Sequence, residues 1–263
     1  MERLTQLSRS VRDKRVIVTG AASGMGRATA HLFADEGARV AILDQEHVGV
    51  QRVVDEITAV HGVNAALGVV ADVGSLSALK VAVAQVVDGL GGIDILINNA
   101  GVSMINSAFQ AEDDFESNWA TTLDINLTSH ARLIRLCLPH LQANGAGRVV
   151  NIASTESVVM TAGLAAYAAT KAGVVGLTKS FAVELGRHGI TVNCVCPGPI
   201  NTGMTSAIDG EAKATYARRR VPLRRYGEPE EVAHMTLNLC LPASSFVNGA
   251  VVTVDGGMTV RHT

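Results

Sequence analysis

Short apolar runs alternate with longer amphipathic stretches along this chain of 263 residues. The apolar runs cover residues 15–19, 39–43, 65–70, 93–97, 148–152, 190–195 and 250–254. The amphipathic stretches cover residues 24–36, 46–61, 75–90, 112–144 and 164–188. Strands that are separated by helices form right-handed crossover units and hence a parallel sheet. We therefore expect an α/β fold with a doubly wound parallel sheet of about seven strands and helices on both faces.

The composition fits such a sheet and argues against some binding partners. The chain is 48% hydrophobic, with 26 Gly but only five Phe, three Tyr and one Trp. Its core must therefore consist of small and branched aliphatic side chains, which are typical of covered parallel sheets. The formal net charge of −2 gives no overall attraction to nucleic acid or to an anionic membrane. We expect neither as a partner.

The ends of the chain and its cysteines carry little functional signal. Residues 1–15 are polar and contain no apolar run of signal-peptide length, and the apolar stretch 161–178 includes a lysine. We expect a cytoplasmic protein with one domain over residues 1–263, since no linker or repeat divides it. Cys194 and Cys196 lie in a strand-like run. We expect their side chains to point to opposite faces, and we expect no disulfide and no metal site.

Polar and small residues follow the predicted strands. They are Thr19-Gly20, Asp44, Asp72, Asn98-Asn99-Ala100-Gly101, Ser154 and Pro197-Gly198. In parallel sheets of this kind, ligands bind beyond the carboxyl ends of the strands. The sequence therefore predicts one binding site along this edge.

The first strand runs into the glycine-rich turn 19–26, which reads Thr-Gly-Ala-Ala-Ser-Gly-Met-Gly. Glycines let a phosphate approach the backbone, and the start of the next helix presents free N–H groups. The spacing Gly-x3-Gly-x-Gly differs from Gly-x-Gly-x2-Gly, and the Lys-Ser/Thr ending of a triphosphate loop is missing. Cofactor binding and an ordinary strand-to-helix turn both remain open from this turn alone.

Asp44 ends the second predicted strand, 18 residues after Gly26. This is close to the spacing of an acid that accepts hydrogen bonds from the adenosine ribose. The carboxylate would repel a 2′-phosphate, and Ser23 offers no compensating charge. The arrangement favours NAD over NADP, and a surface acid at a strand end is the alternative.

Tyr167 and Lys171 are four residues apart in a predicted helix, so they share one face. A free phenol has a pKa of about 10 and is a poor base at neutral pH. A neighbouring ammonium group favours the phenolate, and such a pair can exchange a proton with an alcohol or carbonyl oxygen. Ser154 supplies a hydroxyl that could hold the same oxygen.

Taken together, these motifs resemble those of the classical short-chain dehydrogenases/reductases. The matching segments are the turn 19–26, Asn-Asn-Ala-Gly at 98–101, Asn126 within Asp-Ile-Asn-Leu, Ser154, Tyr167-x3-Lys171, and Pro197-Gly198. The resemblance extends from Lys14 to Gly257. It implies a Rossmann-like fold and an enzyme that transfers a hydride between NAD and a secondary alcohol or ketone.

The resemblance also assigns roles. Tyr167 would be the acid/base, Ser154 would orient the substrate oxygen, Lys171 would lower the pKa of Tyr167, and Asn126 would support a water-linked proton relay. The implied cofactor-binding residues are Gly20, Ser23, Gly24, Met25, Gly26, Asp44, Asp72, Val73, Asn99, Ala100, Gly101, Tyr167, Lys171, Pro197, Gly198, Ile200 and Thr202. The family also implies a homotetramer.

The substrate is less constrained. The variable lid of the family corresponds to residues 203–226, which include Arg218-Arg219-Arg220 and Arg224-Arg225. These arginines could bind an anionic substrate group, or they could be a solvated face or subunit contact. Glu156 departs from the small residues usual after the serine, and it is either a substrate contact or a solvated loop acid. Tyr216 and Tyr226 are candidates for shaping the pocket.

Several activities remain open at this stage. Pro222-Leu223 and the segment 227–232 resemble the 3-oxoacyl-thioester reductases, although Asp44 opposes the NADPH preference usual in that branch. A hydroxysteroid or dihydrodiol dehydrogenase fits equally well. The alternative from another class is a non-catalytic NAD-binding regulator, which the intact set of four candidate catalytic residues disfavours.

Overall fold

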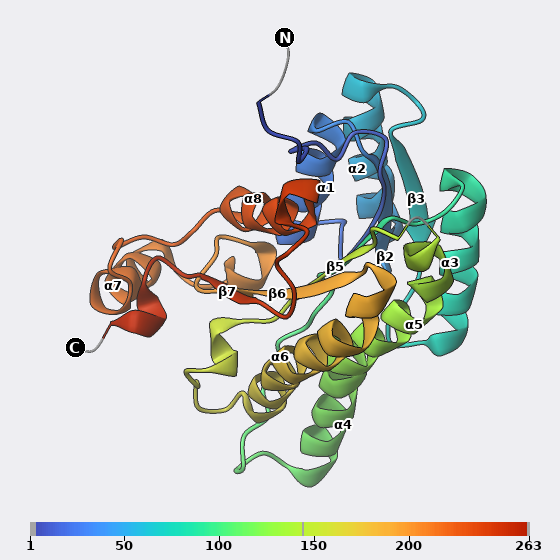
Figure 1. Ribbon diagram of the computed structural model, residues 1–263. Coiled ribbons are helices and arrows are strands. Elements are labelled where there is room, and N and C mark those ends of the chain that lie inside the picture. The colour runs from blue at the N-terminus through green and yellow to red at the C-terminus, as the bar shows by residue number, and fades with distance from the viewer. Residues whose placement is uncertain (1–3, 144, 262–263) are drawn as a thin grey trace.

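The computed structural model describes residues 4–143 and 145–261 and contains one seven-stranded parallel sheet. The strands are β1 (Arg15–Thr19), β2 (Arg39–Asp44), β3 (Ala66–Val70), β4 (Ile95–Asn98), β5 (Arg148–Ile152), β6 (Thr191–Pro197) and β7 (Val251–Val254). Their order is β3-β2-β1-β4-β5-β6-β7, so the winding reverses between β1 and β4. The predicted doubly wound sheet is confirmed (Figure 1).

Helices cover both faces of this sheet. They are α1 (Gly24–Asp35), α2 (His47–His61), α3 (Leu76–Leu90), α4 (Glu112–Leu123), α5 (Ser129–Gln142), α6 (Ala165–Leu185), α7 (Gly210–Arg220) and α8 (Pro229–Cys240). Side chains of α1, α2 and α8 form the core on one face, while α3, α5 and α6 form the core on the other. The sequence patterns had not predicted α7 or α8.

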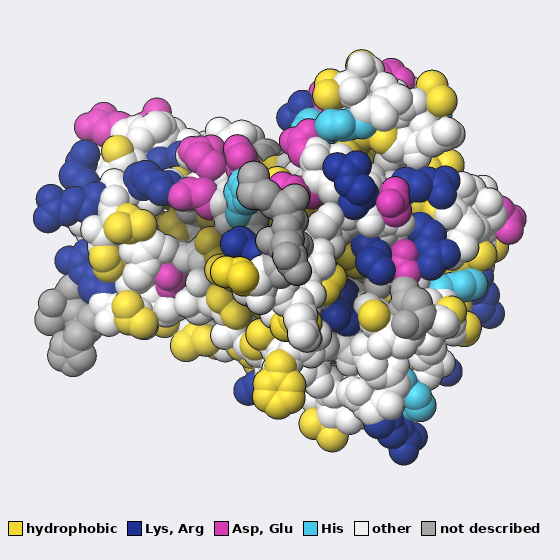
Figure 2. Space-filling model, turned by 45° about the horizontal axis from the view of Figure 1, so that its top comes forward, with side chains coloured by type: hydrophobic (Ala, Val, Ile, Leu, Met, Phe, Trp, Pro, Cys, Tyr) yellow, Lys and Arg dark blue, Asp and Glu magenta, His cyan; other side chains and the backbone are white. Residues whose placement is uncertain are grey.

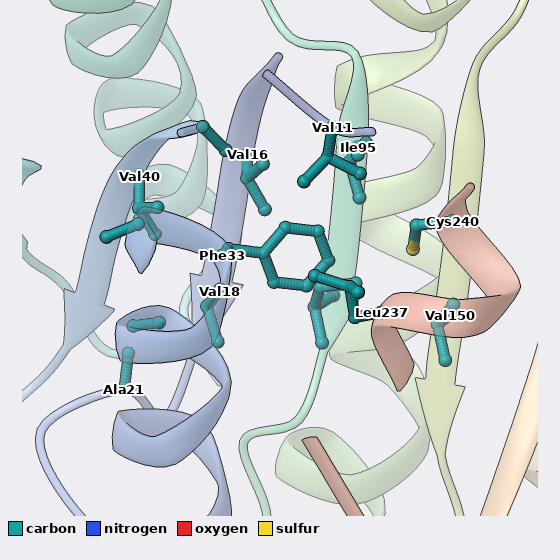
Figure 3. Close-up of a cluster of buried hydrophobic side chains, with 14 of the residues drawn as sticks. Val11, Val16, Val18, Ala21, Phe33, Val40, Ile95, Val150, Leu237 and Cys240 are labelled. Atoms are coloured by element: carbon teal, nitrogen blue, oxygen red, sulfur yellow. The ribbon is translucent and has the colours of Figure 1, made fainter. Parts of the chain in front are cut away.

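Alternating residues of each strand supply the two cores. Val16 and Val18 of β1 pack on the first face, and Ile17 between them packs on the second. Phe33 of α1 is fully buried, and its ring lies between the sheet and Leu237 of α8 (Figure 3). The aliphatic core expected from the composition is thus built around a single large ring on this face.

The predicted helical region 112–144 is divided by a π turn. The regular helix α4 ends at Leu123, the π turn spans Asp124–Thr128, and α5 begins at Ser129. Asn126 lies in the π turn and is fully buried. Such turns insert an extra residue into a helix and are frequent at functional sites.

Our expectation for the cysteines of β6 was wrong in its geometry. Cys194 and Cys196 lie together in one buried cluster with Ala153 and Val174. Residues two apart in a strand share a face, because side chains alternate with a period of two. Both thiols are free. Within the described residues no group of His, Cys, Asp and Glu side chains could hold a metal ion.

No helix within residues 4–143 and 145–261 combines the length and apolar character that crossing a membrane requires.

An ion pair joins the starts of β1 and β4. The guanidinium of Arg15 donates two hydrogen bonds of 2.8 Å to Asp94, and the Arg15 backbone N–H donates a third of 2.9 Å. The Asp94 residue is 4% exposed. Burial opposes its ionisation, but the bonds from Arg15 outweigh burial and hold the pKa of Asp94 below its ordinary value.

We expect Asp94→Asn to lower the free energy of unfolding at pH 7 by about 2–3 kcal/mol, because it leaves Arg15 without its anionic partner. Since the folded-state pKa is depressed, this stabilisation is complete above the unfolded pKa and is lost as pH falls through the folded value. Urea unfolding at pH 7 and at pH 3 measures both effects. Asp35→Asn, which breaks the exposed pair with His61, should change stability by under about 0.5 kcal/mol. Equal effects of the two variants would contradict the prediction.

Candidate functional site

A cavity of about 310 Å³ opens at the carboxyl ends of the central strands. It brings together most of the residues that the sequence predicted. Those lining it are Gly20, Ser23, Gly24, Met25, Asp44, Asp72, Val73, Asn99, Ala100, Gly101, Tyr167, Lys171 and Thr202. The remaining predicted residues do not line it; they are Gly26, Pro197, Gly198, Ile200, Asn126 and Ser154. Gly203 and Met204 of the predicted lid also line it, as do residues that were not predicted, namely Gln45, Ala71, Val102, Ile125, Ile152 and Ala153.

The glycine-rich turn brings backbone close to backbone. Gly20 has φ +63°, and a Cβ there would lie 2.8 Å from the Cα of Ala100. A Cβ on Gly26 would collide with the carbonyl oxygen of Gly20. Ser23, which precedes α1, makes no side-chain cap, so N–H groups at this helix start remain available to an anion.

Thr19 joins the glycine-rich turn to the segment after β4. Its hydroxyl oxygen accepts hydrogen bonds from the backbone N–H groups of Asn99 (2.9 Å) and Ala100 (3.0 Å). The side-chain amide of Asn99 donates to the Thr19 carbonyl at 2.8 Å. The other side-chain atom, Oδ1 of Asn99, is buried with no hydrogen-bond partner among the described residues.

Asp44 is held in place by backbone groups. Its Oδ2 accepts from the N–H of Ala22 at 3.1 Å, and its Oδ1 accepts from the N–H of Glu46 at 3.2 Å. The side chain of Arg27 on α1 forms an ion pair with Glu56 of α2. The sequence patterns did not predict a second positively charged group near this turn, that of Arg52.

Arg52 of α2 donates to the carbonyl of Ala22 at 2.8 Å. A guanidinium thus lies beside the turn that also binds Asp44. No local pattern signals this approach, because Arg52 is 30 residues from Ala22 in the chain.

Tyr167 and Lys171 both lie on α6 and both line the cavity. The Lys171 ammonium group is buried, donates to the Ile152 carbonyl at 2.9 Å, and lies 5.5 Å from the centre of the Tyr167 ring. Burial lowers the pKa of Lys171 to about 8.

The pKa of Tyr167 differs from our expectation. Burial raises it above its ordinary value, a hydrogen bond with Ser154 acts in the opposite direction, and the charge of Glu156 raises it further. The net result is a raised pKa, opposite in direction to the lowering that we expected from Lys171.

Asn126 forms a reciprocal pair with Val102. Its Oδ1 accepts from the Val102 N–H, and its Nδ2 donates to the Val102 carbonyl, both at 2.8 Å. A Cβ on Gly101 would lie 3.3 Å from Asn126 Oδ1 and 3.5 Å from Lys171 Nζ. The π turn thus fixes the segment after β4 next to the lysine.

Ser154 lies just beyond β5, where Glu156 is also found. The Ser154 hydroxyl oxygen accepts from the Glu156 N–H at 3.1 Å. The Glu156 carboxylate accepts from the N–H (2.8 Å) and the hydroxyl (2.6 Å) of Thr161. Burial is the largest cause that raises the pKa of Tyr167 and of Tyr216, and the charge of Glu156 raises both further. Glu156 is therefore a bonded loop acid whose charge reaches the site.

The arginines near the lid have different partners. Arg225 forms two hydrogen bonds of 2.6 and 2.7 Å with Glu231. Arg218 donates to Thr215 of its own helix. Arg219 and Arg220 line a shallow hollow on α7, outside the central cavity. Figure 2 shows Lys and Arg side chains gathered at the left edge of the molecule, where α7 lies.

The two lid tyrosines pack against each other edge to face, with ring centres 6.1 Å apart. The hydroxyl of Tyr216 donates to the sulfur of Met258 at 3.5 Å. Neither ring lines the central cavity, and Tyr216 lines the separate hollow on α7.

Comparison with known proteins identifies the family. Residues 20–259 match a family model described as enoyl-(acyl carrier protein) reductase. The chain is 40% identical over 250 residues to (2S)-((R)-hydroxy(phenyl)methyl)succinyl-CoA dehydrogenase subunit BbsD of Thauera aromatica, covering 95% of this chain and 98% of that one. It is 36% identical to a 3-oxoacyl-(acyl-carrier-protein) reductase of Vibrio cholerae, covering 93% and 97%.

Solved structures agree with these relatives. A short-chain type dehydrogenase/reductase from Mycobacterium marinum superposes with a TM-score of 0.89 at 31% identity, covering 96% of this chain and 98% of that one. An L-sorbose reductase from Gluconobacter frateurii, solved with NADPH and L-sorbose, gives a TM-score of 0.89 at 28% identity, covering 96% and 99%. The chain therefore belongs to the short-chain dehydrogenase/reductase family and is an oxidoreductase of that family.

Proposed function

We propose that this protein is an NAD-dependent dehydrogenase that interconverts a secondary alcohol and the matching ketone. The observation that supports this most is a single cavity with three kinds of group on its wall. These are the open start of α1, the carboxylate of Asp44, and the Tyr167–Lys171 pair. A dinucleotide needs the first two, and proton transfer at a carbinol oxygen needs the third.

The residues present fit such a cofactor. The glycine-rich turn would hold its diphosphate, Asp44 its adenosine ribose, and the Asn99–Gly101 segment its middle part. Pro197 ends β6, and it would flank the nicotinamide end together with Gly198, Ile200 and Thr202, which follow the strand. Bound there, the dinucleotide would supply the hydride acceptor or donor.

The chain's own residues would handle the proton. In alcohol oxidation the Ser154 hydroxyl would hold the substrate oxygen by a hydrogen bond. The phenol oxygen of Tyr167, ionised, would take the proton of the alcohol hydroxyl. The Lys171 charge would favour that phenolate, and Asn126 would keep the neighbouring backbone and its water in place. Ketone reduction reverses each step.

Two relatives favour a thioester as the substrate class. One is named as the dehydrogenase of a CoA thioester and the other as a reductase of an acyl-carrier-protein thioester. A 3-hydroxyacyl thioester contains the secondary alcohol that the proposed chemistry requires. A hydroxyacyl-thioester dehydrogenase is therefore our second candidate.

We also infer that residues 1–263 form one catalytic domain in which residues 203–226 are the substrate lid. We propose that the protein is a homotetramer and that it is cytoplasmic. The many small residues of α6 (Ala165–Leu185) would allow close helix contact between subunits.

Tyr167→Phe should lower kcat for alcohol oxidation by at least about 100-fold, because it removes the proton acceptor. Binding of NAD, followed by fluorescence titration, should change by less than about threefold. Tyr226→Phe, which leaves Tyr167 unchanged, is the control. Normal turnover by Tyr167→Phe would refute the assigned role.

Asp44→Asn should reduce the preference of kcat/KM for NAD over NADP by at least about tenfold. The change removes the charge that repels a 2′-phosphate and leaves Arg52 as the local charge. Arg52→Gln in the native background should weaken NADP use further. Native rates with NADP equal to those with NAD would overturn the proposal.

We also propose that the arginines of α7 bind an anionic group of the substrate at the hollow outside the central cavity. Replacing Arg218, Arg219 and Arg220 together by Gln should then raise KM at least about fivefold for acidic substrates and leave neutral alcohols unchanged. Steady-state rates on a matched acid and its amide measure this. Arg9→Gln, near the N-terminus, is the control. An equal rise in KM for both substrates would contradict recognition of an anionic group.

A further inference from the structure

Arg132 of α5 is a charged side chain that the proposed chemistry leaves without a role. Its Nη1 donates a hydrogen bond of 2.8 Å to the backbone carbonyl of Gly74, 58 positions away in the chain. Gly74 lies just before α3, and α3 and α5 cover the same face of the sheet (Figure 1). A bond from a charged donor is stronger than one between neutral groups.

The bond reaches the loop that joins β3 to α3. Three successive residues of this loop, Ala71, Asp72 and Val73, line the central cavity, and Gly74 comes directly after them. Arg132 itself does not line the cavity. It therefore contacts the loop from behind the cavity wall, where it can act on the position of the wall without touching what binds there.

Other bonds fix the shape of this loop and one of its ends. The Oδ1 of Asp72 accepts from the Gly74 N–H at 2.8 Å, and the Asp72 carbonyl accepts from the Ser75 N–H at 3.1 Å. The Ala71 N–H donates to the Asp44 carbonyl at 2.9 Å, which joins the start of the loop to β2. Among the residues that the structure describes, Arg132 is the donor to the Gly74 carbonyl.

The π turn lies behind the same loop. A Cβ on Gly74 would lie 3.7 Å from Cγ1 of Ile125, which itself lines the cavity. Arg132 Nη1 lies 3.9 Å from Asp124 Oδ1 at the start of the π turn, with side chains 29% and 53% exposed. So exposed a pair contributes little, and the bond to the Gly74 carbonyl is the stronger contact of Arg132.

The part of the cofactor that would meet this loop follows from the proposed function, on which this inference rests. Asp44 would hold the adenosine ribose, and it pairs in register with Val70 of β3. The residues directly after Val70 are those of the loop that line the cavity. The adenine base attached to that ribose would therefore lie against residues 71–73.

We propose that Arg132 is a positioning residue for the adenine end of the cofactor. Its bond to Gly74 holds the loop 71–75 in the conformation that accepts the base. Without the bond the loop occupies more conformations, and the apparent Kd rises in inverse proportion to the fraction that is competent to bind. Proton transfer at Tyr167 takes place at the other end of the cofactor and does not depend on this bond.

The first test measures binding of NAD and of AMP by fluorescence titration. Arg132→Gln should raise the Kd of both ligands by about 5–10-fold, because the loop loses its charged donor. AMP lacks the nicotinamide half, so an equal effect on the two ligands places the loss at the adenine end. The kcat for alcohol oxidation at saturating NAD should stay within about twofold of the native value.

Two matched variants separate positioning from a general charge effect. Arg135→Gln makes the same change at an exposed residue of α5 and should alter either Kd by less than about 1.5-fold. Arg132→Lys keeps a charged donor and should stay within about threefold of the native Kd. A Kd unchanged in Arg132→Gln, or raised equally in Arg135→Gln, refutes the proposal, and so does a fall in kcat without weaker binding.

The second test uses the protein without cofactor. Backbone hydrogen exchange of residues 73–75 should be at least about threefold faster in Arg132→Gln than in the native protein, and at the native rate in Arg135→Gln. Equal exchange in all three proteins overturns the positioning role. If the native protein does not bind NAD, the proposed function fails, and exchange alone decides whether Arg132 holds the loop. If Arg132→Gln does not fold, Arg132→Met, which keeps the apolar stem, must show the same losses.

Discussion

The contact between Thr19 and the Asn99–Ala100 backbone determines how the site is assembled. It lies where the strand order reverses, between β1 and β4. One hydroxyl oxygen accepts two backbone N–H groups there, and the glycine at position 20 lets the two segments approach. The phosphate-binding turn and the segment beside Lys171 are thereby held as one wall of the cavity, although about 80 residues separate them in the chain.

The π turn between α4 and α5 holds the other end of the same segment. The π turn brings the Asn126 side chain to the backbone of Val102, which continues the segment that Thr19 holds. The segment is therefore bonded from both ends, by a strand-end hydroxyl and by a helix amide. The buried lysine sits against it with its pKa lowered to about 8. This segment lines the central cavity, whereas Arg219 and Arg220 of the surface helix α7 line a separate hollow outside it.

Most of the fold was predictable because strands such as β1 and β4 are short, continuous and apolar, and such runs in alternation with helices have few solutions. The cavity wall was predictable because its residues follow strand ends. Helix α7 is highly polar and gave no apolar period to detect. Arg52 reaches the glycine-rich turn only through tertiary packing. The two-residue period of a strand should have predicted that Cys194 and Cys196 share a face, and our prediction was wrong there. The pKa of Tyr167 depends on burial, which residue spacing does not reveal.

The π turn also has a consequence for helix phase. Each residue of an α-helix advances the side chain by about 100°, so one inserted residue rotates everything after it by that amount. The apolar stripe of α5, which includes Leu133, Ile134 and Cys137, faces the sheet in this rotated phase. Deleting one residue between 124 and 128 would restore an unbroken helix and turn that stripe away from the sheet. The packing of α5 and the position of Asn126 therefore depend on the same irregular turn, and neither can change alone.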